Sequence, residues 1–250
     1  MIITGDLAPN HADRKLLASI DVEWSKNFRI RNGSVPFCFS IAWLLLPDTP
    51  VDLTEVTWTY SSWYVEGADE TQDLIAAADT AFGEVLDTAT LVVGHQFSSD
   101  LGTLINAAHH LVPNLHAVRE NWRRRRAVPA VPMLDTRYDL DRLLAGTSRR
   151  LVDVCTELHL DVTQPELGST SMTALHRRWL EGGDAEARER ITVLNLRHSL
   201  STALVALLGE KHPVPTGEVN VNRLLANRLT GTYAWTSTPA FTALLQERPA

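Results

Sequence analysis

The chain has very few cysteines and no long hydrophobic run. Its two cysteines, Cys38 and Cys155, lie far apart and show none of the short spacings typical of zinc sites. Both lie in apolar segments, which favours buried free thiols in a reducing compartment over a disulfide. Because the sequence shows neither a charged-then-apolar leader nor an apolar run of membrane length, we expect a soluble cytoplasmic protein without a membrane partner.

Lysine is also scarce, with 3 lysines against 20 arginines, and the net charge is −7. This charge argues against a protein that coats nucleic acid nonspecifically. One stretch nevertheless combines a tryptophan that could stack on a base with guanidinium groups that suit phosphate oxygens. The candidate nucleic-acid-binding residues are Trp122, Arg123, Arg124, Arg125 and Arg126. The alternative is a solvated loop or helix end, with arginine usage that reflects a GC-rich genome.

No internal repeat or low-complexity segment is present, and 250 residues with 44% hydrophobic content suit a single α/β domain. Residues 1–15 form a polar lead-in, and a basic connection is expected at 113–129. Strands are predicted at 16–23, 35–45, 56–62, 91–93 and 130–134, the first three as an antiparallel meander. Helices are predicted at 71–86, 97–111, 138–145, 148–158, 171–181 and 184–209, with shorter ones at 219–229 and 240–246.

Two acidic residues close the first predicted strand, in the run Leu-Leu-Ala-Ser-Ile-Asp-Val-Glu-Trp. Asp21 and Glu23 are two positions apart, so in a strand their carboxylates leave the same face. Such a pair repels itself unless a cation lies between the two charges. Hard oxygen ligands of this kind suit Mg²⁺ or Mn²⁺. The alternative is an aspartate that ends a buried strand and a glutamate on a solvated turn.

A second motif lies downstream, in Leu-Val-Val-Gly-His-Gln-Phe-Ser-Ser-Asp-Leu. A short β-branched run meets Gly94, and a helical pattern begins near Phe97, which places Asp100 in the first turns of a helix. Together the two motifs resemble those of the DEDD superfamily of 3′–5′ exonucleases, in which a strand carries Asp-x-Glu and a Val-Gly-His-Asn motif precedes Phe-Asp. Asp135-Thr136, after an apolar strand, is similar to another element of this family.

The resemblance covers roughly residues 16–208 and implies an α/β fold of the ribonuclease H-like type. That fold is a mixed five-stranded sheet flanked by helices. The implied organisation is an exonuclease-like domain over residues 1–212 and a C-terminal appendage over residues 213–250. The appendage resembles no element of the family.

The family's third motif is an aspartate on a late helix, preceded by a histidine or a tyrosine. In the register set by the helix end Thr-Ala-Leu-Val-Ala-Leu-Leu, His198 occupies the aspartate position. Val193 and Leu194 then stand where the general base is usual. The resemblance therefore implies a site of Asp21, Glu23, Asp100 and His198, with imidazole replacing one carboxylate. The alternative for His198 is a surface or core histidine of the helix.

What the resemblance implies is phosphodiester hydrolysis from the 3′ end of DNA or RNA, single strands included, by two Mg²⁺ or Mn²⁺ ions. Because His198 removes one negative charge, weaker metal binding is expected. Slow turnover is expected because the usual histidine or tyrosine base is absent. A second hypothesis is a degenerate exonuclease-like domain that binds nucleic acid or a protein without cleaving. A third is an unrelated α/β protein in which the matches are coincidental.

Overall fold

Strand β2 (Leu16–Lys26), which carries Asp21 and Glu23, lies in the interior of a mixed sheet. It pairs antiparallel with β3 (Ser34–Leu45) and parallel with β5 (Leu91–Gly94). Beyond these, β3 pairs antiparallel with β4 (Trp58–Tyr64), and β5 pairs parallel with β6 (Met133–Asp135). The predicted α/β class and mixed sheet are therefore confirmed. This computed structural model describes residues 1–6, 15–26, 33–46, 49, 52–127, 131–140, 143–209 and 218–246.

A sixth strand extends the sheet beyond the five that were predicted. Strand β1 (Ile2–Gly5) pairs antiparallel with β4, so the order is β1-β4-β3-β2-β5-β6. The prediction of a polar lead-in over residues 1–15 is wrong for these four residues. They alternate between half-buried and exposed positions, as an edge strand does, and Gly5 ends the strand with φ +93°.

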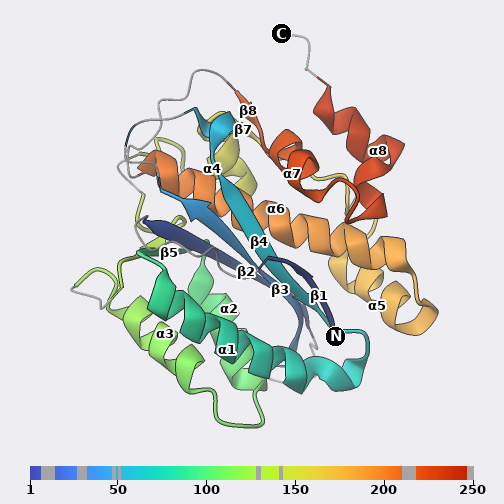
Figure 1. The fold of residues 1–250 in the computed structure, drawn as a ribbon, viewed down its shortest axis with the longest axis horizontal. Helices are drawn as coiled ribbons and strands as arrows, with labels where there is room; N and C mark the ends of the chain where they lie inside the picture. The colour runs from blue at the N-terminus through green and yellow to red at the C-terminus, as the bar shows by residue number, and fades with distance from the viewer. Residues whose placement is uncertain are drawn as a thin grey trace.

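Helices cover both faces of the sheet (Figure 1). Alternate side chains of β2 go to the two sides: Leu17 packs with α6, whereas Ala18, Ile20 and Val22 pack with α1 to α3. The described α-helices are α1 (Thr71–Thr88), α2 (Phe97–Ala107), α3 (Pro113–Arg123), α4 (Leu151–Glu157), α5 (Met172–Gly182), α6 (Ala185–Gly209), α7 (Val221–Leu229) and α8 (Pro239–Thr242).

Two segments differ from the predicted elements. The basic connection at 113–129 begins with helix α3, in which Pro113 stands in the first turn and Leu115, Val118 and Trp122 are buried at helical spacing. The predicted helix at 138–145 is not formed in its described part, which consists of turns, a bend and irregular backbone. Residues 128–130 and 141–142 of these two stretches, including the start of the strand predicted at 130–134, lie outside the described residues.

The C-terminal segment packs against the core. A two-stranded parallel sheet joins β7 (Leu160–Asp161) to β8 (Val219–Asn220), and Leu225, Trp235 and Phe241 belong to the same buried cluster as α6. The expected boundary at residue 212 lies outside the described residues. Figure 1 shows α7 and α8 beside α6, on the side of the sheet opposite α1 to α3.

The expectation that the chain has no apolar run of membrane length is wrong for helix α6, which is long and apolar enough to cross a membrane by length and composition alone. In the structure, 89% of its most apolar 18-residue window is buried. Its apolar character is therefore accounted for by packing, since one side contacts β2 and β3 and the other contacts α4, α5 and α7.

Candidate metal centre

Asp21 and Glu23 point from β2 toward helix α6. They share the face of Leu17, opposite Ser40 and Cys38 of β3 in the strand register. The side chain of Asp21 is 19% exposed and that of Glu23 is 7% exposed. The sheet therefore holds two carboxylates side by side and largely buried from solvent, where like charges are costly unless they are compensated.

Helix α6 supplies the compensating charge. Nδ1 of His198 lies 3.5 Å from Oδ2 of Asp21 and 3.3 Å from Oε1 of Glu23. The other ring nitrogen, Nε2, lies 3.1 Å from Nε2 of Gln164, which fixes the orientation of the imidazole. His198 thus faces the acidic pair, as its position in the third motif predicts, and is not a surface histidine.

Together Asp21, Glu23 and His198 form a group that could hold a metal ion. One ligand atom from each lies within 4.8 Å of the other two. Oε1 of Glu23 is buried and has no hydrogen-bond partner among the described residues, so one lone-pair site remains available. Two carboxylates and one imidazole are a donor set that divalent ions accept in proteins.

The electrostatics show how the group is balanced without an ion. Burial raises the pKa of Glu23 to about 7, and the charge of Asp21 adds to this effect, whereas His198 opposes it. Burial alone would lower the pKa of His198, but the close approach of the two carboxylates and their negative charges outweigh it and raise that pKa to about 10. When it is protonated, the His198 ring would therefore take the place of a cation beside the two carboxylates.

Asp100 lies near this group without joining it. It is in the first turn of α2 and only 5% exposed. Burial raises its pKa well above the ordinary value, and the charges of Asp21, Glu23 and Asp135 raise it further. The ligand atoms that come together within 4.8 Å in the described part of the chain do not include those of Asp100. The structure thus brings three of the four predicted site residues together and places the fourth within electrostatic range.

The ends of β5 and β6 form one border of the site. Gln96 has a left-handed backbone (φ 62°) just before α2, and its backbone N–H donates to Oδ1 of Asp135. His95 is held from both sides, with Nδ1 2.9 Å from the hydroxyl of Thr136 and Nε2 2.9 Å from the carbonyl of Arg149. Burial lowers the pKa of His95 to about 4, so its neutral ring braces the junction.

Asn195 was missed by the sequence analysis. It lies one turn before His198 on α6, and its amide nitrogen donates to Oδ2 of Asp21 at 2.6 Å and to the carbonyl of Asp21 at 3.2 Å. The thiol of Cys38 donates to its carbonyl oxygen at 3.6 Å, and this buried thiol is free, as predicted. A three-residue spacing before His198 puts Asn195 on the same helix face, and this signal was present in the sequence.

The predicted nucleic-acid contact of Trp122 is wrong, because this side chain is 1% exposed. It packs edge-on against Phe97 and donates its indole N–H to Ser98, so the ring has no free face for a base. Arg125 is 14% exposed and is engaged by Asp139 at 2.7 Å. The arginine stretch is therefore partly a structural brace between α3 and the segment after β6.

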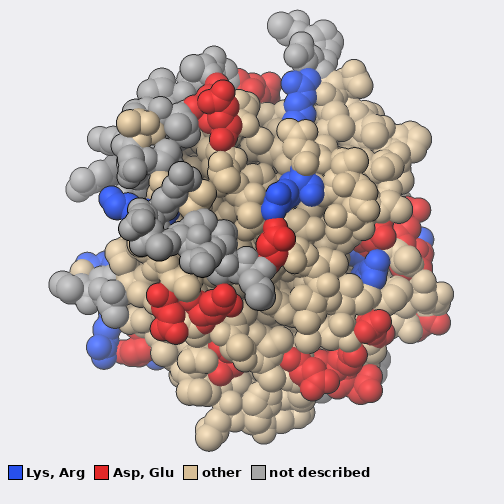
Figure 2. Space-filling view, viewed as in Figure 1, with Lys and Arg blue, Asp and Glu red and all other residues tan. Residues whose placement is uncertain are grey.

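The remaining arginines are exposed but paired. Arg124 contacts Glu120 at 2.9 Å, Arg123 contacts the same carboxylate at 3.9 Å, and Arg126 contacts Asp139 at 2.7 Å. On the face drawn in Figure 2, acidic side chains gather in its lower part, and basic side chains are scattered among other residues. The exposed arginines remain candidates for a phosphate contact, with their charge already offset by neighbours.

The chain matches no protein-family model and no curated protein. A function can therefore be inferred only from the sequence and the geometry of the site.

Proposed function

We propose that the protein is a metal-dependent 3′–5′ exonuclease of the DEDD type with a ribonuclease H-like fold. The observation that carries the proposal is the convergence of Asp21, Glu23 and His198, which are separated by up to 177 positions in sequence, on one small group of ligand atoms. The strand order is in keeping with it, since the antiparallel strands β2, β3 and β4 are followed along the chain by β5 and β6, which extend the sheet in parallel from β2.

The proposed cofactor is Mg²⁺ or Mn²⁺, two ions in all. Bound ions would neutralise the scissile phosphate and activate the attacking water. Asp21, Glu23 and His198 would hold one ion, and Asp100 is the candidate ligand for the second. Asn195 keeps Asp21 oriented, and Gln164 keeps the His198 ring oriented. Because one ligand is a neutral imidazole when it binds metal, we expect Mn²⁺ to be preferred over Mg²⁺.

The test is hydrolysis of a 5′-labelled single-stranded oligonucleotide, DNA and RNA in parallel, with Mn²⁺ or Mg²⁺. We expect a ladder that shortens from the 3′ end, abolished by Asp21→Ala. Asp87→Ala, which removes an exposed carboxylate at the end of α1, is the matched control and should retain activity. Equal hydrolysis by wild type and Asp21→Ala would refute the proposal.

A second candidate is a degenerate domain that binds nucleic acid without cleaving it. One observation favours it: the His198 ring lies 3.5 Å from Asp21 and 3.3 Å from Glu23, where its protonated form would offset the charge of the carboxylates without a metal. This candidate predicts oligonucleotide binding without divalent ions, weakened by Arg124→Ala and by added salt. Arg228→Ala removes another exposed, paired arginine, from α7, and should leave binding unchanged.

A further inference from the structure

Gln164 contacts Nε2 of His198 at 3.1 Å from a segment that is neither helix nor strand. This segment begins after β7, which ends at Asp161, and it includes Glu166. Because irregular backbone is not held by a ladder of its own hydrogen bonds, the position of the Gln164 amide depends on what fixes the two ends of the segment. Both ends are fixed by the C-terminal segment, whose described residues are 218–246 and which lies outside the family resemblance.

The first end is joined to the C-terminal segment by the small parallel sheet. Leu160 of β7 pairs with Val219 of β8, and Asp161 pairs with Asn220. Asn220 also caps α7, because its side chain accepts the backbone N–H of Asn222 at 2.9 Å. Strand β7 and the start of α7 are therefore held together.

The second end is held by a buried polar cluster around Glu166. Each carboxylate oxygen of Glu166 accepts from a terminal nitrogen of Arg197 at 2.5 Å, and one of them also accepts from Nε1 of Trp235 at 3.3 Å. The backbone carbonyl of Glu166 accepts from Arg190, whose guanidinium carbon lies 5.0 Å from the centre of the Trp235 ring. A fully buried carboxylate with this many partners has little freedom to move.

The same cluster holds the turn of α6 that carries His198. Arg197 directly precedes His198, and its Nε donates to the side-chain carbonyl of Asn222 from α7 at 2.8 Å. Trp235 donates its backbone N–H to Glu189, near the start of α6, at 2.9 Å. The C-terminal segment therefore holds both elements whose side chains meet at Nε2 of His198.

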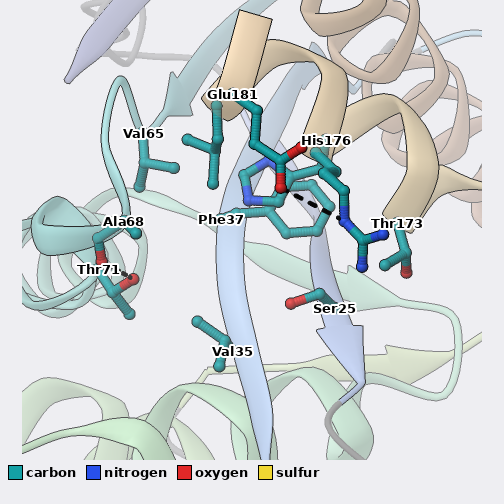
Figure 3. A pocket seen from close by; sticks show the side chains of 11 residues that line it. Ser25, Val35, Phe37, Val65, Ala68, Thr71, Thr173, His176 and Glu181 are labelled. Carbon is teal, nitrogen blue, oxygen red and sulfur yellow. Dashed lines mark hydrogen bonds and ion pairs between the residues drawn. The ribbon is translucent and has the colours of Figure 1, made fainter.

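Helix α5, another neighbour of α6, is attached separately. Its His176 stacks on Phe37 of β3, with centroids 3.9 Å apart, and Figure 3 shows both rings beside a pocket of about 430 Å³. The lining of this pocket includes no residue of the metal centre or of the C-terminal segment. Toward α6, the ring of Trp179 lies beneath Arg188, with 5.1 Å between the guanidinium carbon and the ring centre. This contact lies well before the turn of His198.

We propose that the C-terminal segment positions the metal centre, and that Glu166 is the positioning residue through which it acts. Trp235 and Arg197 hold the carboxylate of Glu166. Glu166 in turn fixes Gln164, two residues earlier, and that amide orients the imidazole of His198. An effect on metal binding rests on the proposed function, whereas the orientation of the ring can be measured without a metal. Outer contacts of this kind change metal affinity by about tenfold to a hundredfold.

Two variants release the cluster in different ways. Trp235→Phe removes the indole N–H and keeps an aromatic ring in its place. The double variant Glu166→Met with Arg197→Met removes the anchor and leaves neither buried charge alone, so it should keep much of the stability of wild type. Trp179→Phe is the matched control, because Trp179 also lies beneath an arginine and donates its indole N–H, in this case to the carbonyl of Val65 at 2.9 Å.

The first test is NMR of the metal-free protein. The signals of the Gln164 side-chain amide and of the His198 ring are identified by their loss in Gln164→Ala and His198→Asn. In Trp235→Phe and in the double variant we expect both signals to shift and the Gln164 amide to exchange hydrogen faster, whereas Trp179→Phe leaves both unchanged. A role in stability alone would not move these two groups selectively. Unchanged signals in both cluster variants would overturn the inference.

The second test is Mn²⁺ affinity, measured by calorimetry at a temperature at which every variant is folded. We expect the double variant to bind Mn²⁺ at least about tenfold more weakly than wild type, and Trp235→Phe to show a smaller loss of the same sign. Trp179→Phe should bind as wild type does. Wild-type affinity in a folded double variant would contradict the positioning role.

The outcomes separate this inference from the proposed function. Hydrolysis that depends on Asp21, with unchanged signals and unchanged Mn²⁺ affinity in the cluster variants, would keep the exonuclease and remove the positioning role. Shifted signals of Gln164 and His198 in a protein that binds no Mn²⁺ and hydrolyses nothing would keep the positioning of the imidazole and remove the exonuclease.

Discussion

The amide nitrogen of Asn195 lies 2.6 Å from a carboxylate oxygen of Asp21, 174 residues earlier in the chain. This contact crosses from the middle of α6 to the central part of the sheet. It fixes the carboxylate of Asp21 while His198, one turn later, approaches the same oxygen. Helix α6 is thus the element that completes the site, and Asn195 is its positioning residue.

Asn195→Ala should weaken Mn²⁺ binding by about tenfold to a hundredfold, because hydrogen bonds that orient a ligand influence metal affinity strongly. The affinity can be measured by calorimetry. Asn114→Ala is the matched control, since Asn114 makes the same amide-to-carboxylate contact with Asp79 at a remote place, between α3 and α1. Equal Mn²⁺ affinities of the two variants would show that Asn195 does not support the site.

His198→Asp should convert the site into three carboxylates. Without a divalent ion the charges repel, so the melting temperature should fall below that of the wild type. Added Mg²⁺ should then raise the melting temperature more than it does for wild type, because the ion binds only the folded state. His116→Asp on the exposed side of α3 serves as control. A response to Mg²⁺ equal to that of wild type would mean that His198 is not a ligand position.

The strand that carries the acidic pair was predictable from local pattern. An apolar run that ends in Asp-x-Glu sets the alternation, and the structure follows it, with Ala18, Ile20 and Val22 on the opposite face from Asp21. The late helix was predictable for the same reason, as its length and apolar content exceed what a surface helix needs. These features depend on neighbours in sequence.

Other features depend on partners far away in the chain. Helix α3 was not predicted because its arginines indicated a basic connection, although Leu115, Val118 and Trp122 follow a helical spacing. The edge strand β1 is too short to be recognised alone and forms because β4 offers an unpaired edge. Phe37 and His176 stack on each other across 139 positions of sequence, which no local pattern indicates.

The residue before His198 forms a buried ion pair that anchors the C-terminal segment. Arg197 and Glu166 are both fully buried and joined by two contacts of 2.5 Å, and Arg197 also donates to Asn222 of α7. Arg197→Met should lower the free energy of unfolding by about 3–5 kcal/mol, since it leaves a buried carboxylate without its partner.

The measurement is denaturant unfolding in a double-mutant cycle. The second change, Glu166→Met, should restore much of the stability lost in Arg197→Met. Arg178→Met breaks a partly exposed pair with Asp184 and should cost less than about 1 kcal/mol. A loss of that small size for Arg197→Met as well would contradict the prediction.

His176 should make the protein less stable in acid. Burial lowers its pKa to about 4 from an ordinary value of 6.5, so the unfolded chain takes up the proton first. The stability that the neutral, buried His176 ring contributes is therefore complete above about pH 6.5 and is lost as the pH falls toward 4. The difference of 2.5 pH units corresponds to an upper limit of roughly 3 kcal/mol.

Urea unfolding at several pH values between 7.5 and 4.5 measures this dependence. His176→Gln, which can still accept a hydrogen bond from Tyr64, should lose less stability across the range than wild type does, while His116→Gln should follow the wild-type curve. Identical pH profiles for wild type and His176→Gln would show that the ring titrates in the folded protein as it does in the unfolded chain.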